Sequence, residues 1–189
     1  MKRERQISNA IALVQARRIA LGLPVSTVPT RVTDTTLYLV SRIDGTSNIA
    51  KLTNDDTKKK VGVTNFDGNK LADGRDAIID GIKILCAKDG LVQSNVDFNS
   101  KVIIIPPALL NAELKLVQSN VILLNIPVAD LYQNSYDNDG YRDIASTPYL
   151  AGKEPIEWIL EYPEGASIPA DIIDGVYIKI MCRAIQAIQ

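Results

Sequence analysis

After residue 30, apolar and polar side chains alternate along much of the chain, and a period of two is typical of β-strands. In residues 156–162 (IEWILEY), every second side chain is apolar, with Glu157 and Glu161 between them. Residues 176–185 alternate in the same way. Both patterns predict strands with one buried and one exposed face. The last is long for a terminal segment, which predicts a central place in its sheet.

Residues 101–128 form the most apolar stretch, KVIIIPPALLNAELKLVQSNVILLNIPV. It predicts an apolar strand, a break at the two prolines, and then two strands that meet at Ser119-Asn120. In the first arm of that hairpin, Leu114 and Leu116 share the buried face. The second arm, residues 121–126, is apolar at nearly every position, which predicts a strand covered on both faces.

The remaining pattern adds strands at residues 35–43, 48–53 and 78–87, the last with a predicted β-bulge at Asp80-Gly81. Eight or nine strands follow residue 30, and no helix-length segment lies between them. This predicts an all-β fold, an antiparallel two-sheet β-sandwich over residues 29–189. Residues 132–155 are too polar and too long for a hairpin link, so an exposed loop is expected there.

Residues 4–21 instead show helical spacing of apolar side chains, and Gly22 and Pro24 predict the helix end. The stripe consists of Ile7, Ala10, Ile11, Val14 and Leu21. Arg17 and Arg18 follow near the end, so residues 1–28 make a basic helical arm with a linker. Three roles stay open: packing on its own domain, docking on a neighbouring subunit, or touching nucleic acid or an acidic membrane.

Composition indicates an ordinary soluble globular domain of 189 residues, with 46% apolar residues, 23% charged residues and a net charge of −1. No apolar run reaches the ~20 residues of a membrane helix. Polar residues interrupt the N-terminal segment, which argues against a secretory signal. The protein is therefore expected to stay in the compartment where it is made.

Histidine is absent, which removes the commonest general base and metal ligand. Cys86 and Cys182 lie in apolar strands and are interpreted as reduced core residues. Glu157 and Glu161 are roughly 13 Å apart along one strand, too far for a glycosidase pair. No nucleotide-binding or nucleophile motif occurs. The chain is predicted to be no enzyme, with no cofactor and no metal.

Three weaker candidates remain for ligand binding. Asp137, Asp139 and Asp143 around Gly140 resemble part of a calcium loop, but the closing glutamate is missing. Residues 58–60, three lysines, are a possible phosphate patch beside acidic neighbours. Tyrosines in the 132–155 loop would make a recognition surface for carbohydrate or another ligand; they are Tyr132, Tyr136, Tyr141 and Tyr149.

Four segments follow a known order of strands, hairpins and turns: TNFDGNKLADGRDAIIDGIKIL (64–85), IIIPPALLNAELKLVQSNVILLNIPVADL (103–131), PIEWILEYPEG (155–165) and VYIKIMCRAI (176–185). By these, residues 31–189 resemble the jelly-roll capsid proteins of tailless icosahedral bacteriophages. The resemblance implies eight strands in a single jelly roll, an N-terminal arm that reaches a neighbour, and function in assembly without an active site. The arm is less basic than those that neutralise packaged genomes.

The leading hypothesis is therefore a structural virion protein, a major shell or vertex subunit of an icosahedral capsid, assembled in the host cytoplasm. Its partners would be other copies of itself and other capsid proteins, with weak contact of the arm to nucleic acid or an internal membrane. A non-catalytic carbohydrate- or ligand-binding module is the alternative. Candidate interface residues are Ile7, Ile11, Val14, Arg17, Arg18, Tyr136 and Tyr141, together with the outward-facing Ile159 and Ile185.

Overall fold

The computed structural model describes residues 2–24, 31–43, 48–88, 93–98, 105–133, 140–166 and 176–188, with the backbone alone described for residues 2–7, 88 and 133. Its elements in chain order are α1 Lys2–Ala20, β1 Arg31–Arg42, β2 Ile49–Lys51, β3 Arg75–Lys88, η1 Gln93–Asn95, α2 Pro107–Leu110, β4 Glu113–Gln118, β5 Val121–Pro127, α3 Val128–Gln133, β6 Arg142–Asp143, β7 Tyr149–Leu150, β8 Ile156–Glu161 and β9 Val176–Ile188.

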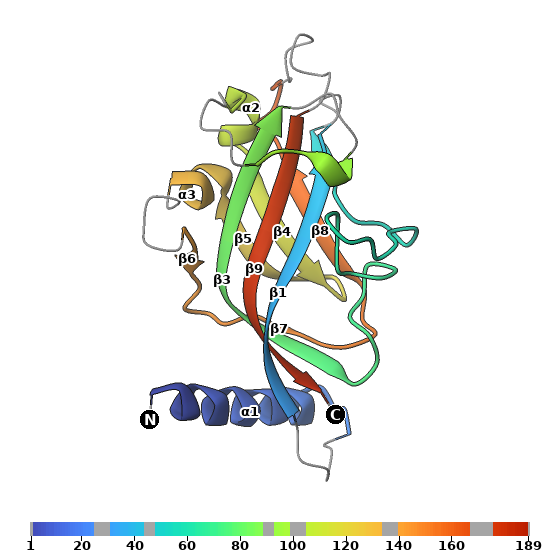
Figure 1. Cartoon of the computed structure of the whole chain (residues 1–189), viewed down its shortest axis with the longest axis vertical. Helices are drawn as coiled ribbons and strands as arrows, with labels where there is room; N and C mark the ends of the chain where they lie inside the picture. Colours follow the sequence, from blue (N-terminus) through green and yellow to red (C-terminus); the bar gives the residue numbers. More distant parts are fainter. Residues whose placement is uncertain are drawn as a thin grey trace.

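Two antiparallel sheets make up the fold. One has the strand order β1-β9-β3-β6, with β7 also paired to β3, and the other has the order β2-β8-β4-β5. In Figure 1, β1, β9 and β3 run side by side in front of β4, β5 and β8, and α1 lies across the lower end. The predicted two-sheet β-sandwich with an N-terminal helix is confirmed.

The alternating strands supply the core. Ile156, Trp158 and Leu160 of β8 are buried between the sheets, as are Ile178 and Ile180 of β9. β9 lies between β1 and β3, so its predicted central position is confirmed. The opposite face of β8 is directed toward solvent, where Glu157 pairs with Lys51 and Glu161 pairs with Lys115. The separated carboxylates are therefore surface ion pairs.

Both predicted local irregularities are present. The register between β3 and β9 shifts between Ile79 and Gly81, which is the bulge expected at Asp80-Gly81. Ser119 and Asn120 have φ values of 50° and 63°. Two consecutive residues with positive φ make the type I′ turn that suits the twist of a tight hairpin, and β4 pairs with β5 on either side of it.

The prediction that residues 121–126 are covered on both faces is wrong. β5 pairs with β4 alone and is the edge of its sheet. Leu124 and Ile126 are buried, whereas Val121 and Ile122 are 58% and 57% exposed. Apolar composition alone does not distinguish a central strand from an edge strand that carries apolar side chains on its open side.

The structure also corrects the expectation of an exposed loop for residues 148–151, which are buried. β6 and β7 pair with β3 and extend the larger sheet. Periodicity does not detect strands of two residues. Residues 134–139 lie outside the described part of the chain, as do residues 101–104 of the strand predicted before the two prolines.

Cys86 and Cys182 are both buried and unpaired, as predicted for core thiols. Burial raises the pKa of Cys86 to about 12 and raises that of Cys182 further. Both thiols therefore stay protonated at neutral pH, and protonated thiols are poor nucleophiles.

We expect no thiol labelling by a maleimide in the native protein and two labelled residues in denaturant, measured by mass spectrometry. Rapid native labelling would contradict the packing of these strands.

No helix among the described residues is long and apolar enough to cross a membrane.

Candidate assembly surfaces

Helix α1 packs on the outer face of the larger sheet near its lower end. Ala10 and Val14 are buried against Ile78 of β3 and Ala187 of β9. Because Val14 is only 2% exposed, this candidate interface residue contacts its own sheet. Ile11 is half-buried, and the side chain of Ile7 lies outside the described residues.

A buried ion pair fixes the end of α1. Arg18 Nη1 lies 2.5 Å from Asp76 Oδ2, and the two side chains are 11% and 1% exposed. Arg18 Nε donates to the carbonyl oxygen of Pro24, and the backbone N–H of Gly152 donates to Asp76 Oδ1, each at 2.9 Å. Burial alone would lower the pKa of Arg18, but the hydrogen bond and charge of Asp76 outweigh it and the pKa is raised.

The two neighbouring arginines therefore have different roles. Arg18 is held inside the chain by Asp76, whereas Arg17 is exposed. A pattern of helical spacing places both near the helix end, but it does not show that a carboxylate 58 residues later lies beneath one of them.

Gly152 stands where a side chain has no room. A Cβ atom there would lie 2.8 Å from the carbonyl oxygen of Arg75 and 2.9 Å from that of Ala72. We expect Gly152→Ala to lower the free energy of unfolding by about 1–3 kcal/mol, because backbone must shift to accept the methyl group. The measurement is urea denaturation followed by circular dichroism.

The shift would also pull the Gly152 N–H away from Asp76. In an Asp76→Ala background that hydrogen bond is already lost, so Gly152→Ala should cost less than in the wild type. Equal costs in the two backgrounds would contradict this coupling.

Tyr141 lies in a charged cluster on the outer face of the larger sheet. The Lys83 Nζ atom is 4.4 Å from its ring centroid, and Arg183 Cζ is 5.5 Å away. Arg183 also bonds Asp80 at 2.8 Å and Asp143 at 2.6 Å. Gly81 permits this, because a Cβ there would lie 3.1 Å from the guanidinium carbon. The cluster ties β6 to β3 and β9.

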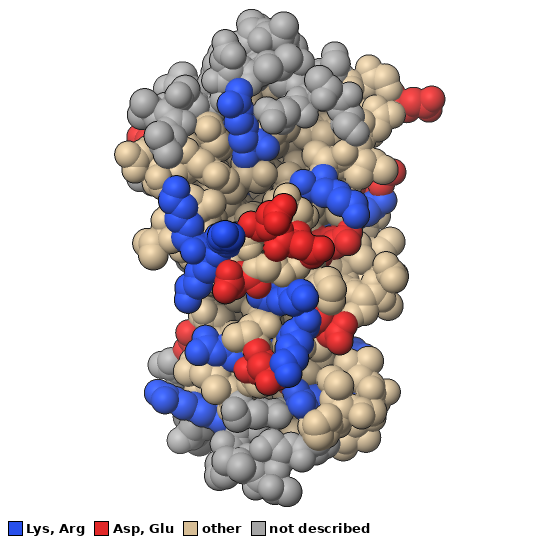
Figure 2. Space-filling view, turned by 90° about the vertical axis from the view of Figure 1, so that its right-hand side faces the viewer, with Lys and Arg blue, Asp and Glu red and all other residues tan. Residues whose placement is uncertain are grey.

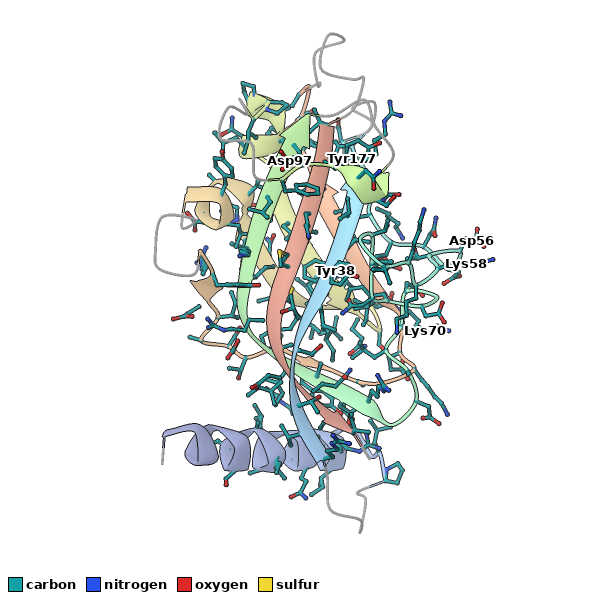
Figure 3. All side chains as sticks on the ribbon, viewed as in Figure 1. Tyr38, Asp56, Lys58, Lys70, Asp97 and Tyr177 are labelled. Atoms are coloured by element: carbon teal, nitrogen blue, oxygen red, sulfur yellow. The ribbon has the colours of Figure 1, made fainter. Side chains whose placement is uncertain are left out.

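A second cation–aromatic group lies higher on the same face. Lys179 Nζ is 5.8 Å from the ring centroid of Tyr38 and 5.5 Å from that of Phe98. Figure 3 labels Tyr38 partway along β1 and Tyr177 near the start of β9. Strands β1 and β9 and the segment after η1 thus meet on this half of the sheet.

The lysines of residues 58–60 are exposed in a loop that also carries acidic side chains. In Figure 3, Asp56, Lys58 and Lys70 project from this loop on the right of the view. Figure 2 turns this side to the viewer and shows Lys and Arg interspersed with Asp and Glu. A mixed surface of this kind does not make the single-sign patch that phosphate binding needs.

Apolar side chains gather at the C-terminal end of α1, the same end that Arg18 holds. A groove of about 550 Å³ separates the helix end from the β4–β5 hairpin, and Leu21, Val121 and Ile122 line it. All three side chains are more than half exposed. Another hollow, of about 940 Å³, lies between α1 and the outer sheet face and is lined by Asp80 and Arg183, which bond one another.

The tyrosines of residues 132–155 do not form the single surface that the sequence suggested. Tyr149 is buried, and burial raises its pKa. Tyr132 packs against the core, Tyr141 lies in the charged cluster, and Tyr136 is outside the described residues. Of the predicted calcium ligands, Asp143 pairs with Arg183, while Asp137 and Asp139 are also outside them.

Within the described ranges, no three His, Cys, Asp or Glu side chains cluster as a metal site would need. Comparison of the chain with models of protein families, with curated proteins and with solved structures gave no match.

Proposed function

We propose that the chain is a structural virion protein, a jelly-roll capsid subunit that works by assembling with copies of itself and with other capsid proteins. The observation that carries the proposal is the order in which the strands pair. β1 pairs with β9, β2 with β8, β3 with β6 and β7, and β4 with β5.

These pairs are nested. If β6 and β7 are counted as one interrupted strand along β3, the first strand pairs with the last, the second with the seventh, the third with the sixth and the fourth with the fifth. A single long antiparallel hairpin that rolls up on itself makes this set of pairs. Eight strands paired in this way in two sheets support the jelly roll, a fold of capsid, lectin and cupin domains.

The interior and the surface favour the capsid role among these. Apolar side chains, including Phe66, Trp158 and Tyr162, fill the space between the sheets, whereas a cupin holds its ligand inside the roll. The chain has no histidine to hold a metal there. The exposed apolar groove at Leu21 and Val121 instead supports a surface that another protein covers.

The alternative, a carbohydrate- or ligand-binding module, relies on an exposed tyrosine surface. The burial of Tyr149 and the ionic surroundings of Tyr141 weaken it. Contact of the N-terminal arm with nucleic acid or an internal membrane stays a prediction, with Arg17 as its exposed basic residue near the helix end.

Size and shape of the purified assembly test the proposal. Light scattering and negative-stain electron microscopy should show closed particles of uniform diameter, formed by the chain alone or with the other proteins of its virion. A chain that stays monomeric at high concentration and is absent from particles would overturn it. Glycan binding that Tyr141→Ala abolishes would favour the alternative.

A further inference from the structure

The groove between α1 and the β4–β5 hairpin leaves apolar surface uncovered. Of the six large apolar side chains that are highly exposed among the described residues, Leu21, Val121 and Ile122 line this one groove. Leu21 belongs to the helix end, and the other two begin β5. Monomeric proteins seldom leave apolar side chains gathered in this way unless a partner covers them.

The half of β5 beside the groove carries neither charge nor proline. β5 is an edge strand, and residues 121–124 carry no charge and no proline. Natural edge strands that stay solvent-exposed are usually guarded by lysine, proline or a covering loop. The open edge therefore supports a second chain as the occupant of the groove.

The charges around the groove are self-complementary. Among the described residues, its lining includes one cation, Arg17 on the helix wall, and one carboxylate, Glu154 on the hairpin wall. Ser119 Oγ donates to Glu154 Oε2 at 2.8 Å, which holds that carboxylate on the hairpin side. When two identical surfaces meet about a two-fold axis, residue i contacts residue j of the other copy and the reverse.

We propose that this groove is a homotypic contact in which the helix end of one copy packs on the hairpin of a second copy, and reciprocally. Leu21 would cover Val121 and Ile122 of the partner subunit, and Arg17 would face Glu154 of the partner subunit. The inference rests on the proposed function, because it names one of the contacts through which the subunit assembles.

Sedimentation velocity over a range of concentrations tests the contact in the full-length chain. The wild type is expected to form dimers or larger assemblies. Ile122→Lys puts a charge at the apolar centre and should raise the dimer dissociation constant about a hundredfold or more. The matched control is Ile49→Lys, at the opposite edge of the same sheet and 53% exposed; it should leave that constant within about twofold of the wild type.

A charge swap tests the pairing itself. Arg17→Glu and Glu154→Lys should each weaken association, by about tenfold, because like charges then meet across the axis. The double variant restores opposite charges and should recover association. Single variants that leave the dissociation constant unchanged, or a double variant no better than either single one, would overturn the contact.

The readouts separate this inference from the proposed function. Particles that form equally well with Ile122→Lys would overturn the contact and leave the capsid proposal standing. Dimers that respond to the charge swap but never enter particles would overturn the capsid proposal and leave the contact standing. Association that appears only with added lipid vesicles would overturn the contact and assign the groove to a membrane surface.

Discussion

Replacing Asp76 with alanine is expected to lower the free energy of unfolding by about 3–5 kcal/mol. The substitution leaves the largely buried guanidinium of Arg18 without its anion and the N–H of Gly152 without its acceptor. A buried charge that loses its partner keeps the cost of desolvation but not the compensating attraction. Chemical denaturation followed by circular dichroism measures the loss, which should lower the Tm by roughly 6–20 °C.

The matched control is Asp73→Ala. Asp73 pairs with Lys153 at 2.8 Å, and both side chains are mostly exposed. Exposed pairs are screened by water and ions, so this variant should unfold like the wild type. Removing the buried cation as well, in Arg18→Met with Asp76→Ala, should recover part of the stability. If Asp76→Ala were no more damaging than Asp73→Ala, the ion pair would not hold α1 on the sheet.

The same ion pair shows where sequence reasoning ends. The period of the N-terminal segment was sufficient to predict a helix over residues 4–21, against an observed Lys2–Ala20. It did not show which side of the helix would be covered, or by what. The answer depends on Asp76 and Ala187, which lie far from the helix along the chain and contact it through the larger sheet.

Strands with regular alternation were predictable because one face must be buried and the other wet. This holds for β8 and β9. The bulge in β3 was predictable for another reason, because Asp80-Gly81 stands inside an apolar strand. The burial of β5 was misjudged because its exposed apolar side chains give the same sequence pattern as a strand that is covered on both faces. A strand that is apolar all round but lies at an edge is itself a signal of a partner, and it becomes visible only once the sheet order is known.

The candidate assembly residues show the same difference between local spacing, which the sequence reveals, and contacts between distant segments, which it does not. The sequence placed Val14 and Arg18 on the interface list because it showed their spacing but not their buried contacts. It missed Val121 and Ile122 as surface residues for the opposite reason. A groove made by residues 100 positions apart, such as Leu21 and Val121, leaves no local pattern.

Replacing Trp158 with alanine is also expected to cost about 3–5 kcal/mol of stability. The indole is 1% exposed, lies in the core between the sheets and sits on the strand position opposite Leu116 of β4. The cavity left by its removal would border both sheets, and the lost contacts would not be recovered unless the sheets moved together. Because Trp158 is the only tryptophan, far-ultraviolet circular dichroism is the appropriate probe for this variant.

Two matched variants separate volume from the other properties of this side chain. Trp158→Phe keeps most of the volume and removes an indole N–H that has no hydrogen-bond partner in the described structure, so it should cost less than about 1.5 kcal/mol. Ile159→Ala changes the next residue, which is half-buried on the outward face of β8, and should cost about 1 kcal/mol or less. Equal losses for Trp158→Ala and Ile159→Ala would mean that the two faces of β8 are buried alike, which a core confined to the space between two sheets does not allow.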